Sequence, residues 1–122
     1  MDWGEADRNP YLRGFDAMCR LMAGRVRPDG VMCYSDPLAI GVIDAILEKK
    51  LRVPQDVAVM GSGNVAALRE TRIPLTSIEL AGVEIGQRTA KLVLRALSGE
   101  QVSSNRSVLV SPRIVVRRST SV

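Results

Sequence analysis

Residues 57–66 carry glycines at a spacing that could do chemistry. They read V-A-V-M-G-S-G-N-V-A, an apolar run followed by Gly61, Gly63 and Ala66, and Glu79 follows about 18 residues after Gly61. This spacing fits a dinucleotide-binding fingerprint, in which glycines let the backbone approach a pyrophosphate and an acidic residue binds a ribose hydroxyl. A nucleotide-dependent enzyme is therefore one hypothesis.

The chain after these glycines favours a structural turn. A dinucleotide site needs a full crossover helix, because the pyrophosphate rests on the N-terminus of that helix. Pro74 follows closely, and the residue before a proline is steered away from helical geometry, so at most about two helical turns fit. Glycines also serve turns that need a positive φ. We expect a turn here, with no bound cofactor.

The residue types present exclude most common catalytic sites. The chain has no histidine, which removes the usual general base, the usual triad partner and the commonest zinc ligand. The two cysteines, Cys19 and Cys33, lie in apolar stretches without metal or redox spacing, so we expect buried, unbonded thiols. No paired-carboxylate or G-x-S-x-G arrangement is found. We expect a protein without catalytic activity and without a metal.

Composition points to a single soluble unit. With 122 residues, 46% apolar and 25% charged, the chain suffices for one compact domain or part of one. The net charge of +4 is spread along the chain, as on solvated helix faces, and does not form a nucleic-acid-binding cluster. No stretch has the length of a membrane span or the pattern of a signal peptide. We expect a cytoplasmic location.

The elements that position these residues follow from periodicity and turn signals. A stripe from Leu12 to Met22 predicts a helix ending near Gly24, and Ser-Asp-Pro at 35–37 predicts a helix with Asp36 as N-cap. Expected strands are residues 31–34, 57–60, 76–79, 108–110 and 114–116, and further helices are residues 65–69 and 83–97.

Alternating short strands and helices predict an α/β fold with a parallel sheet flanked by helices. We expect strands 31–34 and 57–60 to be adjacent and parallel, inside a three-layer lobe.

Several short motifs together carry a family resemblance. They are Asp2-Trp3, Gly14-Phe15-Asp16-Ala17, residues 28–31, 35–41, 51–61 and 74–78, Gly86, and residues 117–120. In this order and spacing they resemble the C-terminal part of the LacI/GalR family of transcriptional regulators. The resemblance implies a periplasmic-binding-protein-like (flavodoxin-like) fold, in which two lobes close on a small effector and signal to a helix-turn-helix domain on operator DNA.

The resemblance also implies an organisation for the chain, which we expect to be incomplete. Residues 1–80 correspond to the distal, effector-binding lobe. Residues 81–104 contain a helix expected to pack on a missing proximal lobe, and residues 105–122 supply C-terminal strands that complete the lobes. The chain leaves no room for the DNA-binding domain, so operator DNA would be bound only through a missing N-terminal domain.

Five positions match family positions around the effector: Trp3, Ser35, Asp36, Gly63 and Leu80. The resemblance implies that Trp3 packs on the effector and that Ser35 hydrogen-bonds it, whereas Asp36 is mainly the helix cap. Gly63 stands where sugar-binding relatives have an acidic residue, and Leu80 where many have glutamine. The loss of those polar groups favours a flat, largely uncharged ligand, and a sugar is the alternative.

The resemblance implies a homodimer as well. Family dimers pair through the surface formed by the segment 65–71 and the preceding helix, which predicts an interface at Ile40, Ala67, Glu70 and Thr71. Two alternatives remain open: an exported sugar-binding protein of the same fold, and the dinucleotide-binding enzyme fragment.

Overall fold

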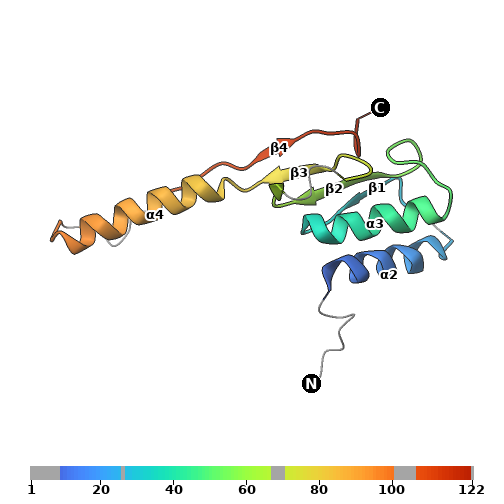
Figure 1. Ribbon diagram of the computed structural model, residues 1–122, viewed down its shortest axis with the longest axis horizontal. Coiled ribbons are helices and arrows are strands. Elements are labelled where there is room, and N and C mark those ends of the chain that lie inside the picture. The colour runs from blue at the N-terminus through green and yellow to red at the C-terminus, as the bar shows by residue number, and fades with distance from the viewer. Residues whose placement is uncertain (1–8, 26, 67–70, 101–106, 122) are drawn as a thin grey trace, which may run out of the picture.

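The computed structural model describes residues 9–25, 27–66, 71–100 and 107–121. The elements, in chain order, are α2 (Pro10–Met22), β1 (Gly30–Met32), α3 (Asp36–Glu48), β2 (Ala58–Ser62), β3 (Thr76–Glu79), α4 (Gly82–Leu97) and β4 (Arg113–Val115) (Figure 1). The other predicted helix and strand positions agree with these bounds to within a few residues, except in the segment before β4, whereas most of the predicted short helix at 65–69 lies outside the described residues.

The four strands form one sheet in the order β1-β2-β3-β4. β1 and β2 pair in parallel, with Val31 opposite Val59, which confirms the prediction for these strands. β2 and β3 are also parallel, whereas β4 joins β3 in the antiparallel direction. The predicted strand at 108–110 is wrong, because these residues run back beside α4 and pair with no described strand.

Helix α2 begins where local chemistry requires it. The side chain of Asn9 accepts hydrogen bonds from the backbone N–H groups of Tyr11 at 2.9 Å and Leu12 at 3.4 Å. Pro10 occupies the first helical position, where its missing N–H is no loss. The buried residues of α2 are Gly14, Met18 and Met22, so the predicted stripe is correct at Met18 and Met22, whereas Leu12 is 40% exposed.

Two glycines let α2 and α3 touch through their backbones. A Cβ atom on Gly14 would lie 2.1 Å from the carbonyl oxygen of Leu38, and one on Gly41 would lie 2.0 Å from that of Tyr11. Neither space can hold a methyl group without separating the helices. The close contact brings Met18 and Met22 into the same core as α3.

The core lies between the helices and the sheet. Its members are buried apolar side chains of α2, α3, β2 and the flanking loops, namely Met18, Met22, Cys33, Ala39, Val42, Ile43, Ala45, Ile46, Val53, Val57, Val59 and Leu75. In Figure 1, α3 packs beneath the sheet and α2 packs beneath α3. Both described helices of the lobe therefore lie on one side, and the expected third layer is not seen among the described residues.

The C-terminal segment closes the lobe by a route that periodicity did not predict. The backbone N–H of Val59 donates to the carbonyl of Ser119 at 2.9 Å, and the hydroxyl of Ser119 donates to the carbonyl of Val59 at 2.6 Å. The same hydroxyl accepts from the backbone N–H of Thr76 at 2.8 Å. Ser119 is fully buried and links β2 to β3.

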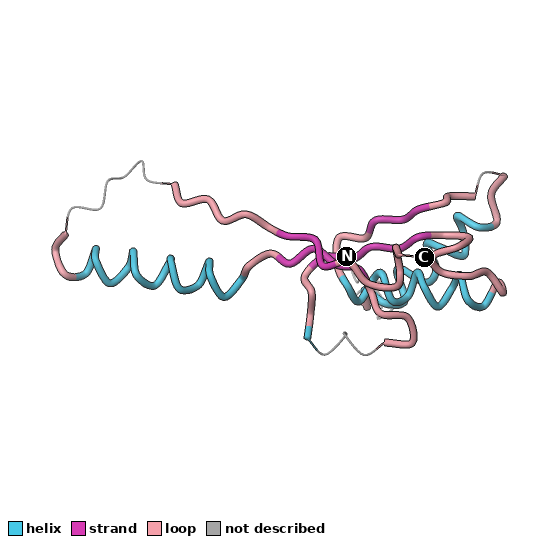
Figure 2. The backbone as a smooth tube through the Cα atoms, turned by 90° about the horizontal axis from the view of Figure 1, so that it is seen from above, coloured by secondary structure: helices cyan, strands magenta, loops and turns pink. Residues whose placement is uncertain are grey.

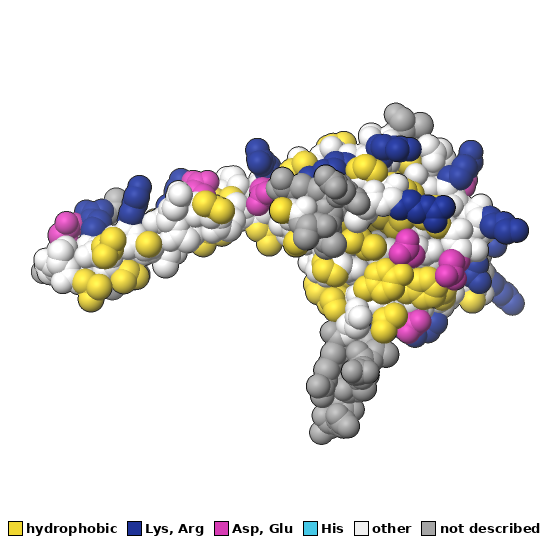
Figure 3. Space-filling view, viewed as in Figure 1, with side chains coloured by type: hydrophobic (Ala, Val, Ile, Leu, Met, Phe, Trp, Pro, Cys, Tyr) yellow, Lys and Arg dark blue, Asp and Glu magenta, His cyan; other side chains and the backbone are white. Residues whose placement is uncertain are grey.

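Helix α4 projects away from the lobe as an arm (Figures 1 and 2). None of its residues is buried, although Val83, Val93, Leu94 and Leu97 are large and apolar. Figure 3 shows apolar side chains along this arm. Within the described part of the chain, no helix is both long and apolar enough to span a membrane.

Candidate functional site

The predicted effector residues that the structure describes gather at one edge of the sheet. Ser35 follows β1, Gly63 follows β2 and Leu80 follows β3, so each stands at the carboxyl end of a parallel strand. The backbone N–H of Gly63 donates to the carbonyl of Ile78 at 2.8 Å, which holds two of these ends together. Ligands of open α/β sheets bind outside this edge. Trp3 lies outside the described residues.

The turn after β2 depends on its glycines. Gly63 has φ +117°, a region that side-chain-bearing residues rarely adopt, and Asn64 follows at φ 48°. A Cβ atom on Gly61 would lie 2.4 Å from a carboxylate oxygen of Asp36 and 2.9 Å from Cδ2 of Leu75. The G-S-G-N sequence thus serves a tight turn, as the turn interpretation predicts.

That turn does not lead into a crossover helix of the kind a dinucleotide site needs. Residues 63–65 are irregular, and residue 71 lies in a bend, so only residues 66–70 are left between them. Five residues cannot form a crossover helix. Glu79, the proposed ribose ligand of that alternative, instead accepts hydrogen bonds from Asn64 and Ala81. The geometry gives the dinucleotide hypothesis no support.

The structure corrects the role of Asp36. Ser35 occupies the N-cap of α3, and Asp36 is the first residue of the helix, so the interpretation of Asp36 as the cap is wrong. Its side chain points into the protein, with 2% exposed. One carboxylate oxygen accepts from the hydroxyl of Ser77 at 2.5 Å, and the other from the backbone N–H of Val65 at 2.8 Å. Asp36 therefore anchors the turn to α3 and β3.

A second polar cluster lies beside this anchor and was not found from the sequence. The side-chain amide of Asn64 donates to Glu79 at 2.7 Å and accepts from the guanidinium of Arg117 at 2.6 Å. Arg117 also donates to the carbonyl of Leu75 at 2.6 Å. These residues are far apart in sequence and share no motif spacing, so only the fold brings them together.

Ser35 and Leu80 differ in what they offer a ligand. The hydroxyl oxygen of Ser35 is buried, does not cap α3 and makes no hydrogen bond to any described residue. Leaving a buried hydroxyl unpaired costs about 1–3 kcal/mol, so a ligand that hydrogen-bonds to Ser35 would remove this cost. Leu80 is half exposed and presents an apolar surface at the same edge.

Of the predicted dimer residues, the structure describes Ile40 and Thr71. Ile40 is half-buried on α3, and Thr71 donates its hydroxyl to the carbonyl of Ile73 at 2.8 Å. Ala67 and Glu70 fall outside the described residues.

Cys33 is buried and unbonded, as predicted, whereas Cys19 is unbonded but only half-buried. The burial of Cys33 raises the pKa of its thiol to about 11, because the thiolate would lose its hydration. A thiol held protonated in this way is a packing group and a poor nucleophile.

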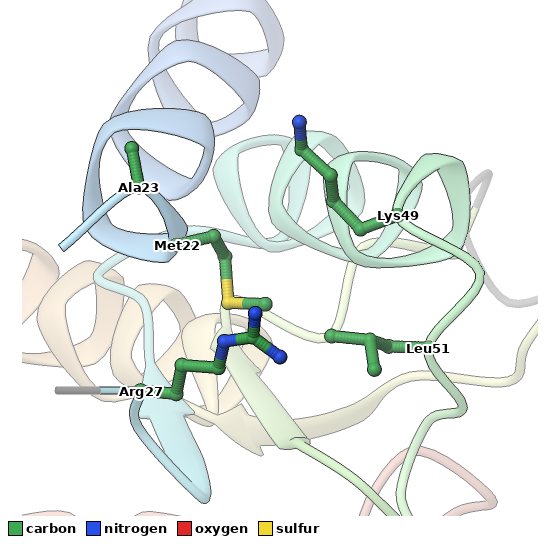
Figure 4. A pocket seen from close by; sticks show the side chains of 5 residues that line it. All are labelled: Met22, Ala23, Arg27, Lys49 and Leu51. Carbon is green, nitrogen blue, oxygen red and sulfur yellow. The ribbon is translucent and has the colours of Figure 1, made fainter. Parts of the chain in front are cut away.

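A pocket of about 220 Å³ at the opposite end of the lobe lacks convergent polar groups. It is lined by Met22, Ala23, Arg27, Lys49 and Leu51 (Figure 4). In Figure 4 the guanidinium of Arg27 lies near Met22 and Leu51, while the ammonium of Lys49 points away from it. The two cations do not face a common point, so the pocket is a weak candidate for an anion site.

Comparison with known proteins identifies the fold's relatives. Residues 3–120 match the periplasmic binding protein-like domain family. The chain is 35% identical over 106 residues to the HTH-type transcriptional repressor PurR of Mannheimia succiniciproducens, covering 87% of this chain and 31% of the repressor. It is 33% identical over 99 residues to the arabinose metabolism transcriptional repressor of Halalkalibacterium halodurans, covering 78% and 26%.

Solved structures of transcriptional regulators also resemble this chain. The transcription regulator GntR of Chromobacterium violaceum matches with a TM-score of 0.81 and 30% identity, over 90% of this chain and 40% of that one. A LacI family regulator of Lactobacillus casei, solved with bound sucrose, matches with a TM-score of 0.75 and 30% identity, over 89% and 40%. The chain spans about a third of the length of the curated relatives. It belongs to the periplasmic binding protein-like domain family, in the form found in LacI-type transcriptional regulators.

Proposed function

We propose that the chain is the effector-binding and dimerisation part of a LacI-type transcriptional regulator, which couples small-ligand binding to operator affinity. The observation that carries the proposal is the edge where Ser35, Gly63 and Leu80 meet at the carboxyl ends of three parallel strands. The named relatives are transcriptional regulators, which supports a binding module without catalysis. Operator binding also implies the cytoplasmic location that the sequence predicts.

Helix α4 supports a two-lobed effector domain. A helix with an apolar face and no buried residue needs a partner surface, because such a face costs free energy in water. We propose that residues 81–104 pack on a proximal lobe, and that residues 105–122 return the chain to the distal lobe formed by residues 1–80. The effector then binds between the two lobes.

The proposed effector is flat and largely uncharged. Ser35 offers one hydroxyl and Leu80 an apolar surface, and Gly63 carries no side chain, while Asp36 keeps both carboxylate oxygens bonded within the protein. Trp3 would supply an aromatic plate for stacking. A sugar is the second candidate, favoured by the L. casei regulator that was solved with sucrose and, separately, with glucose.

A homodimer completes the proposal. Ile40 and Thr71, with Ala67 and Glu70, form the proposed self-complementary surface, because two-fold operators are bound by two-fold proteins. Replacing Ile40 by glutamate places one negative charge from each protomer at the interface without disturbing the buried core. The variant should stay folded by circular dichroism and sediment as a monomer. An unchanged sedimentation coefficient would reject this surface.

An exported sugar-binding protein of the same fold remains the alternative. The two functions separate in one experiment, in which the regulator that contains this chain is incubated with DNA from its own promoter region. Effector-dependent retardation of that DNA supports the regulator. Tight sugar binding without any retardation supports the exported protein.

A further inference from the structure

The chain passes between the lobe and the α4 arm twice. It leaves the sheet at the end of β3, passes Ala81 and enters α4, and it returns through β4 to Arg117. Figure 2 shows these two passages as the connection between lobe and arm. The direction of the arm therefore depends on what holds these two passages.

We call the turn at the end of β2, residues 61–64, the effector-side turn. One of its side chains, that of Asn64, bonds to both passages. The amide nitrogen of Asn64 donates to Oε2 of Glu79, the last residue of β3, at 2.7 Å. The amide oxygen of Asn64 accepts from Nη2 of Arg117, on the returning passage, at 2.6 Å. A primary amide supplies the donor and the acceptor together, which neither aspartate nor an apolar residue can do.

The partners of Asn64 make further hydrogen bonds, Glu79 at the entrance to α4 and Arg117 at the start of β3. Glu79 uses its other oxygen to accept from the backbone N–H of Ala81 at 3.3 Å, and Ala81 precedes α4 with φ 54°. Arg117 donates through its second guanidinium nitrogen to the carbonyl of Leu75, and through its backbone N–H to the hydroxyl of Thr76 at 2.8 Å.

Backbone hydrogen bonds of Asn64 and of the next residue also hold the amide in place. Asn64 is 8% exposed, and its backbone N–H donates to the hydroxyl of Ser77 at 2.9 Å. The next residue donates its backbone N–H to Asp36. A displacement of the turn therefore moves the amide, and the amide moves Glu79 and Arg117.

We propose that Asn64 is the positioning residue that fixes the direction of the α4 arm relative to the lobe and links it to the effector-side turn. The inference rests on the proposed function, because such a link matters when an effector binds at the turn.

The test measures the distance between lobe and arm in the full chain. Spin labels are attached at Glu48→Cys on α3 and Lys91→Cys on α4, two exposed positions, with Cys19 and Cys33 replaced by alanine. Pulsed dipolar spectroscopy then gives the distribution of label distances, and circular dichroism confirms that each variant is folded. No ligand or DNA is needed, so the result is independent of whether the proposed function holds.

Three variants separate positioning from simple stability. Asn64→Gly removes both bonds while tolerating the positive φ, and should widen the distance distribution at least about twofold. Asn64→Asp keeps an acceptor for Arg117 but places a carboxylate against Glu79, and should widen it less. Adding Glu79→Gln to Asn64→Asp restores a donor–acceptor pair and should return the distribution to its original width.

The matched control is Ser121→Ala, which removes an exposed hydroxyl that donates to the carbonyl of Arg117. It should leave the distribution unchanged. Folded Asn64 variants with the original distribution would overturn the proposal, and so would an Asn64→Asp widening that Glu79→Gln fails to reverse. If Asn64→Gly does not fold, the proposal is tested by comparing Asn64→Asp with the double variant Asn64→Asp, Glu79→Gln.

Discussion

The lobe and the α4 arm contain the same residue types under opposite constraints. Gly14 and Gly41 lie where a methyl group would collide with a backbone carbonyl of the neighbouring helix, whereas a Cβ atom on Gly82 or Gly86 of α4 would meet no described atom within 4 Å. Internal packing dictates the residues of the lobe. No residue of α4 is buried, so packing among the described residues does not dictate the sequence of the arm.

Apolar side chains show the same difference. Ile43 and Ile46 of α3 are 3% and 0% exposed, while Val83 and Leu97 of α4 are 78% and 79% exposed. Both helices carry apolar residues at helical spacing, so periodicity alone does not reveal which helix has a partner. Paired substitutions in the two regions test this difference.

The largest effect is expected from removing a core side chain. Ile46→Ala should lower the free energy of unfolding by about 4 kcal/mol, because it leaves a cavity in a fully buried site. Val93→Ala on α4, where the side chain is half exposed, should change it by less than about 0.5 kcal/mol. Urea unfolding followed by circular dichroism measures both. Equal losses would mean that the arm is packed as tightly as the lobe.

Alanine at the glycines should act in opposite directions. Gly41→Ala forces α2 away from α3 and should cost about 3 kcal/mol. Gly86→Ala adds a methyl group in open space on a helix and should stabilise the arm by about 0.5–1 kcal/mol. The same unfolding experiment compares them. Destabilisation by Gly86→Ala would show that another segment of the chain already covers that face.

The sequence predicted well where a local pattern determines the structure. The stripe from Leu12 to Met22 predicts α2, and the apolar runs between turn residues predict the first two parallel strands. These signals are local because helix and strand periodicity depends on neighbouring residues.

The contacts within the candidate site could not be predicted in this way. The sequence around Asp36 predicts a helix cap, yet the fold places Ser77 and Val65 within hydrogen-bonding distance of its carboxylate. Asn64 and Arg117 stand 53 positions apart and meet only because β4 returns beside β3. The effector contacts of Ser35, Gly63 and Leu80 stay predictions.

Removing a serine hydroxyl should also cost more stability in the lobe than in the arm, although the difference is smaller. Ser77→Ala removes a donor from buried Asp36 and an acceptor from the backbone N–H of Asn64, and should cost about 2 kcal/mol. Ser98→Ala removes only an exposed hydroxyl bonded to the carbonyl of Arg95, and should cost a few tenths, within about 0.5 kcal/mol. Thermal unfolding of the two variants measures the difference. Similar losses would contradict the anchoring role of Asp36.

The smallest effect concerns an exposed ion pair of the lobe. Hydrogen bonds from the side chain and the backbone N–H of Arg52 lower the pKa of Asp56 from 3.8 to about 2. Because the folded-state pKa is depressed, the stabilisation is present above pH 3.8 and is lost as the pH falls towards 2.

The Asp56→Asn variant tests this pH dependence. Its unfolding midpoint should lie below that of the original chain at neutral pH, and the difference should vanish as the pH falls through the same range. A difference that stays constant down to the lowest pH would assign the effect to packing and not to the charge of Asp56.

The most direct test of the proposed effector site is calorimetric. The regulator that contains this chain is titrated with a panel of sugars and flat uncharged heterocycles, and the tightest ligand is repeated with Ser35→Ala and Trp3→Ala, using exposed Ser121→Ala as the control. A site at the carboxyl edge of the sheet predicts that Ser35→Ala weakens binding roughly tenfold, Trp3→Ala at least as much, and Ser121→Ala not at all. Unchanged dissociation constants for both Ser35→Ala and Trp3→Ala would contradict it.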